Sequence, residues 1–155
     1  MKMRLVLTKI LVGNGVNMDL LGKRQTKIYG SHSLKDIESE LKNKCIEVLK
    51  LSGICDCELD FFQTNSESEF INHLSKGWDG AILNFGAWTH TSLAIADRLA
   101  ALQLIFVELH MSNISIRESY RHRSYMSQHA LGVVYGFGKN SYLNALFALG
   151  NALKI

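Results

Sequence analysis

The fold of this chain is decided by residues 80–109, which read GAILNFGAWTHTSLAIADRLAALQLIFVEL. Gly80–Leu83 and Leu104–Leu109 are short apolar runs, the second rich in branched and aromatic residues, and both predict buried strands. Between them, Thr91–Leu102 predicts a helix. A strand, a helix and a strand in this order form the unit that connects two parallel strands of one sheet.

The same alternation continues on both sides of this unit. Ser33 followed by Asp36 predicts a capped helix start, and Gly53 predicts where that helix ends. Further strands are expected at Arg4–Val12, Cys57–Phe62 and Leu131–Tyr135, helices at Ser33–Leu51, Ser66–Lys76 and Ser141–Leu153, a long loop at Gly13–Gly30 and a short helical turn at Ile114–Tyr120. The prediction is one α/β domain over residues 1–155, a flavodoxin-like three-layer sandwich with a five-stranded parallel sheet in the order 2-1-3-4-5.

Composition and charge restrict the class of protein. The 155 residues are 47% hydrophobic and 20% charged, as in an ordinary globular domain. The net charge of +3 is too small and too evenly spread to indicate nucleic acid binding, so an anionic partner should be small. No apolar run is long enough for a membrane span. Lys9 interrupts the apolar start, so Met1–Val12 is interpreted as a strand and not as a signal peptide.

Cysteine usage indicates a reducing cytoplasm and no metal. Cys45, Cys55 and Cys57 are odd in number and irregular in spacing, which argues against a disulfide framework. Cys55 and Cys57 could form a metal or redox pair, but no second cluster of ligand residues accompanies them. We therefore interpret them as two thiols at a strand edge.

The common cofactor-binding and nucleophile motifs are incomplete or absent in this sequence. Gly13-Asn14-Gly15 follows a strand, but Met18 stands where a dinucleotide fingerprint has its third glycine. Gly136-Phe137-Gly138 fails for the same reason, at Ser141. No phosphate-binding loop and no Gly-x-Ser-x-Gly elbow is present. A flavodoxin-like hydrolase or reductase, the competing enzyme class, therefore lacks its signature.

Polar side chains gather where the predicted strands end. In parallel sheets the carboxyl ends of the strands meet at one edge, which is where ligands bind. Amides, two histidines and a carboxylate at this edge are suitable for general acid and base chemistry. The residues concerned are Asn14, Asn17, Gln63, Thr64, Asn65, Asn84, His90, Glu108, His110, Ser112 and Asn113.

Six segments, in order over residues 9–150, resemble one known family. They are Asn14–Gly22, Arg24 with Ile28-Tyr29-Gly30, Phe62–Asn65, Leu83–Ser92, Glu108–Asn113, and Arg117 to Tyr125 with the Gly132–Gly138 region. In this order and spacing the chain is similar to the type II 3-dehydroquinate dehydratases. The resemblance implies a lyase that converts 3-dehydroquinate to 3-dehydroshikimate, the third step of the shikimate pathway towards chorismate and aromatic amino acids. It implies no cofactor and no metal.

The resemblance also implies roles for individual residues. The reaction is an anti elimination through an enolate, in which Tyr29 is the base and His110 the acid, with Glu108 beside it. Glu108 and His110 should share one face of their strand, and a carboxylate next to imidazole favours a proton donor. Arg24 is the lid arginine. Arg24 and Arg117 are the cations available to Tyr29, and a nearby guanidinium favours tyrosinate. Arg117 is also expected to bind the substrate. Asn17 supports the enolate through a water molecule.

Substrate binding and assembly are implied in the same way. The substrate carboxylate is expected on Asn84 and on the backbone N–H groups of Met111 and Ser112, and the ring hydroxyls on His90 and Arg121. Asp97 matches an acid that reaches the site of a neighbouring subunit. The family forms homo-oligomers, so a dodecamer built as a tetramer of trimers is expected.

The chain departs from the family where prolines are usual. Val16, Thr26 and Gln128 stand at those positions, and the chain contains no proline. Proline restricts φ, so its loss predicts a more mobile lid over Gly22–Gly30 without loss of the reacting groups. The alternative is a catalytically impaired relic of the family that serves as a structural oligomer.

Overall fold

The sheet has the predicted order. A computed structural model describes residues 7–153 of the chain. Its strands are β1 (Thr8–Asn14), β2 (Cys57–Gln63), β3 (Gly80–Asn84), β4 (Phe106–His110) and β5 (Gly132–Tyr135). They form one parallel sheet in the order β2-β1-β3-β4-β5, which confirms the flavodoxin-like architecture.

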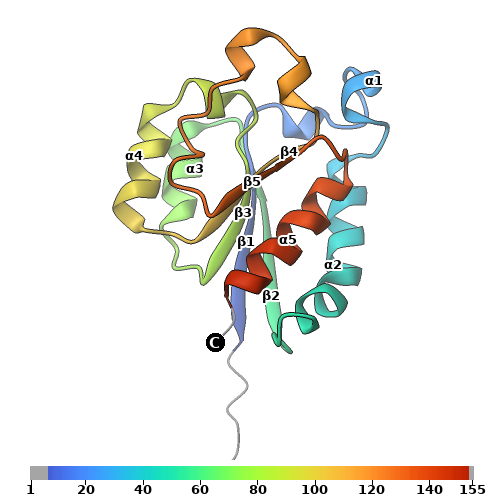
Figure 1. The fold of residues 1–155 in the computed structure, drawn as a ribbon, viewed down its shortest axis with the longest axis vertical. Coiled ribbons are helices and arrows are strands. Elements are labelled where there is room, and N and C mark those ends of the chain that lie inside the picture. Colours follow the sequence, from blue (N-terminus) through green and yellow to red (C-terminus); the bar gives the residue numbers. More distant parts are fainter. Residues whose placement is uncertain (1–6, 154–155) are drawn as a thin grey trace, which may run out of the picture.

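Helices cover both faces of the sheet (Figure 1). On one face, α2 (Leu34–Lys50) packs beside α5 (Asn140–Ala152), and on the other α3 (Glu67–Leu74) packs beside α4 (Leu93–Leu102). Each strand contributes side chains to the cores on both faces of the sheet, because successive side chains point to opposite faces. In β1, Ile10 and Val12 join the core under α2 and α5, whereas Leu11 joins the core under α3 and α4.

Serine caps fix where three helices begin. Ser33 and Asp36 form the predicted capping box of α2, in which each side chain accepts a hydrogen bond from the other residue's backbone N–H. Ser66 and Ser92 accept hydrogen bonds from N–H groups in the first turns of α3 and α4. These caps place the helix starts one or two residues after the predicted ones.

Several strand bounds differ from the prediction. β1 begins at Thr8, and the predicted portion Arg4–Val6 lies outside the described residues. Polar Asn14, Gln63, Asn84 and His110 are the last residues of their strands and not the first residues of loops. The reason is that backbone groups form the sheet ladder, so a polar side chain does not end a strand.

Two predicted irregular segments are more ordered than expected. The 13–30 segment contains a 3₁₀ turn at Met18–Leu20 and the short helix α1 (Thr26–Tyr29), and the predicted turn at 114–120 is two 3₁₀ turns, Ile114–Ile116 and Ser119–Arg121. Both segments lie above the carboxyl ends of the strands (Figure 1). Gly15 brings the first of them against the Phe85 carbonyl, where an added Cβ would lie only 2.5 Å from that oxygen.

Within residues 7–153, no helix is both long and apolar enough to cross a membrane.

Candidate active site

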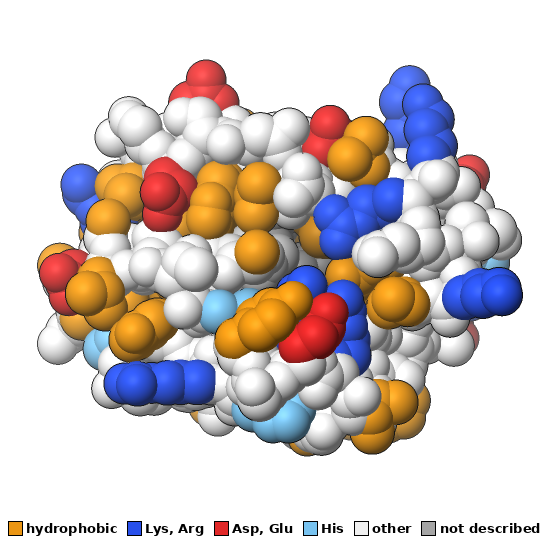
Figure 2. Space-filling view, turned by 90° about the horizontal axis from the view of Figure 1, so that it is seen from above, with side chains coloured by type: hydrophobic (Ala, Val, Ile, Leu, Met, Phe, Trp, Pro, Cys, Tyr) orange, Lys and Arg blue, Asp and Glu red, His pale blue; other side chains and the backbone are white. Residues whose placement is uncertain are grey.

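A small cavity opens at the carboxyl ends of β1, β3 and β4. Its volume is about 120 Å³, which is small compared with sites for drug-sized ligands. Figure 2 looks onto this face and shows Lys and Arg side chains around its centre, with His side chains near them. The described residues lining the cavity include three arginines and no acid. Its polar wall consists of Asn17, Arg24, Tyr29, Asn84, His90, His110, Ser112, Arg117 and Arg121.

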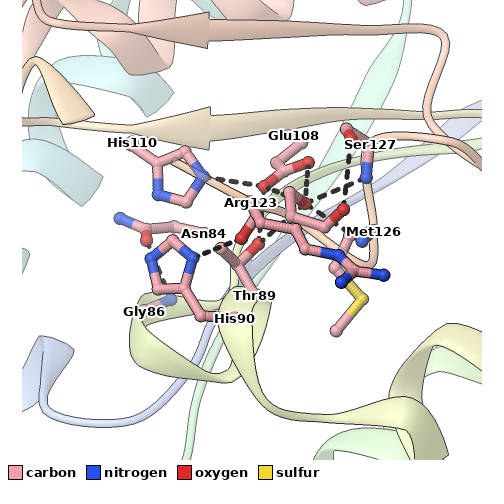
Figure 3. A network of polar contacts seen from close by, with 10 residues as sticks. Asn84, Gly86, Thr89, His90, Glu108, His110, Arg123, Met126 and Ser127 are labelled. Atoms are coloured by element: carbon pink, nitrogen blue, oxygen red, sulfur yellow. Dashed lines mark hydrogen bonds and ion pairs between the residues drawn. The ribbon is translucent and has the colours of Figure 1, made fainter. Parts of the chain in front are cut away.

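His110 and Glu108 form a buried pair at the end of β4 (Figure 3). The distance from His110 Nε2 to Glu108 Oε1 is 2.7 Å, and both residues are buried. The two side chains meet because residues two apart in a strand point the same way, as the sequence predicted. His110 lines the cavity and Glu108 lies behind it.

Three further hydrogen bonds hold the Glu108 carboxylate. Thr89 Oγ1 lies 2.5 Å from Oε1, and Ser124 Oγ lies 2.9 Å from each carboxylate oxygen. Burial favours the neutral carboxyl, but the hydrogen bond and charge of His110 and the bonds from Thr89 and Ser124 outweigh it. The pKa of Glu108 is therefore lowered, and the group is a carboxylate at neutral pH.

Tyr29, at the end of α1, also lines the cavity and lies close to two guanidinium groups. Arg117 Nη1 donates a 2.8 Å hydrogen bond to the Tyr29 hydroxyl, and the Arg24 guanidinium lies 4.6 Å from the ring centroid. Burial opposes ionisation of the phenol, but the hydrogen bond and charge of Arg117, together with Arg24, outweigh it. The pKa of Tyr29 is lowered from its usual value, which favours tyrosinate.

His90 is a neutral ring stacked near His110. Burial is the main reason that the pKa of His90 is lowered, and the charge of His110 acts in the same direction. His90 Nδ1–H donates to the Arg123 carbonyl at 2.7 Å, so the neutral ring has Nε2 as its free acceptor (Figure 3). The His90 and His110 ring centroids are 6.3 Å apart.

The loop after β1 carries Asn17 in the left-handed conformation, with φ 65°. Its backbone N–H donates to Asn65 Oδ1 at 2.8 Å, and Gln63 Nε2 donates to the Gly15 carbonyl at 3.3 Å. The amides after β2 therefore hold the first loop in place. The Asn17 side chain lines the cavity and makes no hydrogen bond to residues 7–153, so it is available to a ligand or a water molecule.

All but two of the residues predicted for the site line the cavity. Glu108 lies behind His110 and contacts it, whereas Asp97 lies on the exposed surface of α4, away from the cavity. Sequence reasoning assigned no individual role to Thr89, Ser124, Asn14 or Tyr142, although Asn14 was among the polar residues expected at the ligand-binding edge. Thr89 and Ser124 were part of the family-like segments, but only the fold brings them onto Glu108.

No group of three or more His, Cys, Asp or Glu side chains in the described part of the chain is arranged to bind a metal ion. Cys55 is exposed and Cys57 is partly buried, with its Sγ 3.7 Å from Cys45 Sγ; the three thiols are free.

Comparison with known proteins identifies close relatives over nearly the whole chain. Residues 8–150 match the family model for dehydroquinase class II. A 3-dehydroquinate dehydratase from Prochlorococcus marinus (strain NATL1A) is 45% identical over 148 residues, covering 94% of this chain and 97% of the relative. One from Actinobacillus pleuropneumoniae serotype 5b is 44% identical over 151 residues, covering 95% and 94%. The crystal structure of a type II dehydroquinase from Butyrivibrio crossotus superposes with a TM-score of 0.83 at 33% identity, covering 92% of this chain and 97% of that one.

Proposed function

The chain belongs to the dehydroquinase class II family, and from this premise we propose that it removes water from 3-dehydroquinate to give 3-dehydroshikimate. The family performs this dehydration in the shikimate pathway. One observation carries the proposal for this chain: a candidate base, Tyr29, and a candidate acid, His110, line the same small cationic cavity. That cavity suits a ligand with one carboxylate.

Tyr29 removes the axial proton at C2 of the substrate, next to the ketone. The lowered pKa of Tyr29 supports this role, because a larger fraction of the phenol is then ionised at neutral pH. Arg117 and Arg24 stabilise the tyrosinate, and as arginines they do not compete for the proton. The electron pair of the broken C–H bond forms the enolate.

His110 delivers the second proton. As the enolate collapses, the C1–O bond breaks, His110 protonates the departing hydroxyl group and water leaves, so the C1–C2 double bond forms. The carboxylate of Glu108 accepts a hydrogen bond from His110 Nε2–H and fixes the ring, which supports this role. Thr89 and Ser124 hold Glu108 in turn. Asn17 places a water molecule at the enolate oxygen, where a donor stabilises the developing charge.

The remaining cavity residues bind the rest of the substrate. Asn84 and the backbone N–H groups of Met111 and Ser112 bind the carboxylate. Neutral His90 accepts a hydrogen bond from a ring hydroxyl through its free Nε2, and Arg121 donates to another. The result is a ring held with C2 towards Tyr29 and C1 towards His110.

We also propose that the chain forms a homo-oligomer, a dodecamer built as a tetramer of trimers. Exposed apolar side chains at the edge strand β5 and on α4 support association, because a bare edge strand favours pairing or cover. They include Leu93, Leu131 and Val133. Asp97, exposed and outside its own cavity, is free to reach a neighbouring site. Sedimentation at micromolar concentration tests this proposal: a stable monomer contradicts it.

The three free thiols fit a reducing compartment, and we propose the cytoplasm.

The structure and the comparisons support neither alternative to the proposed enzyme. Tyr29, Arg24 and His110 all line the cavity, which argues against an impaired relic. Membership of a dehydratase family argues against a hydrolase or reductase.

The test is to incubate 3-dehydroquinate with the purified protein and follow the vinylic proton of 3-dehydroshikimate by NMR. Wild-type protein should form product, and His110→Asn should reduce the rate on the order of 10²-fold or more, because it removes the acid. The control is His129→Asn, a half-exposed histidine outside the cavity, which should retain the wild-type rate. Absence of product from folded wild-type protein would overturn the proposal.

A further inference from the structure

A buried chain of hydrogen bonds runs from the final helix to the floor of the cavity. Tyr142 of α5 donates from its hydroxyl to Asn14 Oδ1 at 2.6 Å and accepts from Asn84 Nδ2 at 3.2 Å. Asn14 and Asn84 end neighbouring strands and are register partners in the sheet. Side chains of all three residues are buried, with at most 3% of each residue exposed.

In this buried chain of hydrogen bonds, each side-chain group has a fixed role as donor or acceptor. Asn14 Nδ2 donates to the carbonyls of Val12 and Phe62, both at 3.4 Å, so its Oδ1 faces Tyr142. The Tyr142 hydroxyl donates its single proton to that oxygen, so towards Asn84 it acts only as an acceptor.

The orientation of the Asn84 amide is fixed from both sides. Its Oδ1 accepts from the Gly86 backbone N–H at 3.2 Å, as Figure 3 shows, and its Nδ2 faces Tyr142. A flipped amide would set Oδ1 against a hydroxyl oxygen with no proton to give, and Nδ2 against an N–H group. Both contacts would be repulsive, and buried groups without partners are costly.

Nδ2 has a second hydrogen, and Asn84 lines the cavity. The direction of the buried chain therefore decides that the amide offers the ligand an N–H donor and not a carbonyl oxygen. We infer that Tyr142 is a positioning residue: it holds the Asn84 amide so that its N–H faces the substrate carboxylate. This inference rests on the proposed function, because that function supplies the carboxylate.

Burial also keeps the Tyr142 hydroxyl in the required form. The pKa of Tyr142 is raised by burial, so the group stays protonated across the neutral and mildly alkaline range. Without the hydroxyl, Asn14 Oδ1 and Asn84 Nδ2 face each other across the vacated position. The Asn84 amide can then turn towards Asn14 and away from the ligand.

The test is Tyr142→Phe, analysed by steady-state kinetics with 3-dehydroquinate. KM should rise about tenfold while kcat stays within about threefold, the pattern expected when a binding contact is lost that does not change in the transition state. Leu149→Val, a buried change at the far end of the same helix, is the control for stability. It should lower the melting temperature without raising KM.

A double-mutant cycle separates positioning from general structural damage. In the Asn84→Ala background, Tyr142→Phe should raise KM no further, because the group through which it acts is already absent. Additive increases in KM, or an unchanged KM in the single variant, would overturn the inference and leave the proposed function intact. If Tyr142→Phe does not fold, Asn14→Ala, which removes the side-chain oxygen that accepts from the Tyr142 hydroxyl, should raise KM in the same way; an unchanged KM there overturns the inference.

If wild-type protein does not turn over 3-dehydroquinate, calorimetric titration with quinate distinguishes failure of this inference from failure of the proposed reaction. Quinate carries the same ring carboxylate. Binding to wild-type protein that weakens about tenfold in Tyr142→Phe would support the inference although the proposed reaction had failed. No binding to wild-type protein would overturn both.

Discussion

Arg117 Nη1 donates a 2.8 Å hydrogen bond to the hydroxyl oxygen of Tyr29, from a residue 88 positions further along the chain. The same nitrogen lies 3.2 Å from Ser112 Oγ, so the guanidinium links the lid to the loop after β4. This contact makes an ordinary phenol into a candidate base, because it favours the ionised form of a buried tyrosine.

Arg117→Met should move the acidic limb of the kcat/KM profile to higher pH. Without the guanidinium, burial and the remaining charge of Arg24 act alone, so the pKa of Tyr29 rises and less tyrosinate is present at neutral pH. Activity at pH 7 should fall on the order of 10²-fold and recover partly in alkaline buffer. Arg123→Met, which removes an exposed arginine outside the cavity, is the control. A fall that is independent of pH would argue against this role for Arg117.

Glu108→Gln should lower kcat by about 10- to 100-fold with little change in KM. The change removes the carboxylate that accepts the hydrogen bond from His110 and fixes its ring, while the shape of the side chain is kept. Steady-state kinetics test this, with Glu38→Gln at an exposed ion pair as the control. If kcat in Glu108→Gln stayed within about twofold of wild type, Glu108 would have only a structural role.

Acid should destabilise the fold in two stages. The pKa values of His90 and of the carboxyls Glu108, Asp36, Glu40 and Glu118 are lowered in the folded state, that of Glu118 to about 2. The unfolded chain therefore binds protons more readily than the folded chain at these sites, so stability falls as pH falls. The loss should begin below about 6.5 with His90 and steepen below about 4.5 with the carboxyls.

Urea unfolding at a series of pH values from 7 to 3 measures this loss. Glu108→Gln should be less stable than wild type at pH 7 but should lose less stability on acidification, because one of the linked groups is absent. A free energy of unfolding that stayed constant or rose towards pH 3 would contradict the lowered pKa values.

Val16→Pro should stabilise the chain by about 0.4–1 kcal/mol. Gly15 to Met18 form a turn in which the Met18 N–H bonds to the Gly15 carbonyl and Asn17 has φ 65° and ψ 7°, the geometry of a type II turn. Proline is favoured at the second position of that turn, which Val16 occupies, and the Val16 N–H donates no hydrogen bond within residues 7–153. Thermal unfolding tests this, and a lower melting temperature would show that the turn does not accept proline.

Proline at Thr26 is a different case. Gln25, just before it, has φ 36° and ψ 53°, and a following proline favours extended backbone instead. The absence of proline there therefore permits the observed lid conformation. Greater mobility of the 22–30 segment remains a prediction, and hydrogen exchange of its amides would measure it.

Local and periodic features of the fold followed from sequence. The Ser33 and Asp36 capping box, the apolar strands and the order of the sheet depend on neighbours a few residues apart or on general rules for parallel sheets. Strand alternation predicted that Glu108 and His110 share one face, although their roles came from the resemblance. For the capping box and for the Glu108 and His110 pair, the pattern and its structural result lie in the same short segment.

Contacts between distant segments could not be predicted from the sequence in the same way. Tyr142 lies in the predicted last helix and had no assigned role, and only the fold brings its hydroxyl to Asn14, 128 residues earlier. Thr89 and Ser124 belonged to family-like segments, yet their convergence on Glu108 depends on how the 119–127 loop returns to β4. Tyr29 was identified by resemblance, with Arg24 and Arg117 as the cations available to it, and the structure adds the hydrogen bond from Arg117 to its hydroxyl.

The most direct test of the central claim is the absorbance of the enone product after purified protein is mixed with 3-dehydroquinate in the presence of EDTA. Wild-type protein should give a steady rise, Tyr29→Phe should lower its rate by about 10³-fold or more, and Tyr120→Phe, at an exposed tyrosine outside the cavity, should leave it unchanged. No rise with folded wild-type protein, or an equal rise with Tyr29→Phe, would contradict a dehydration that starts at Tyr29.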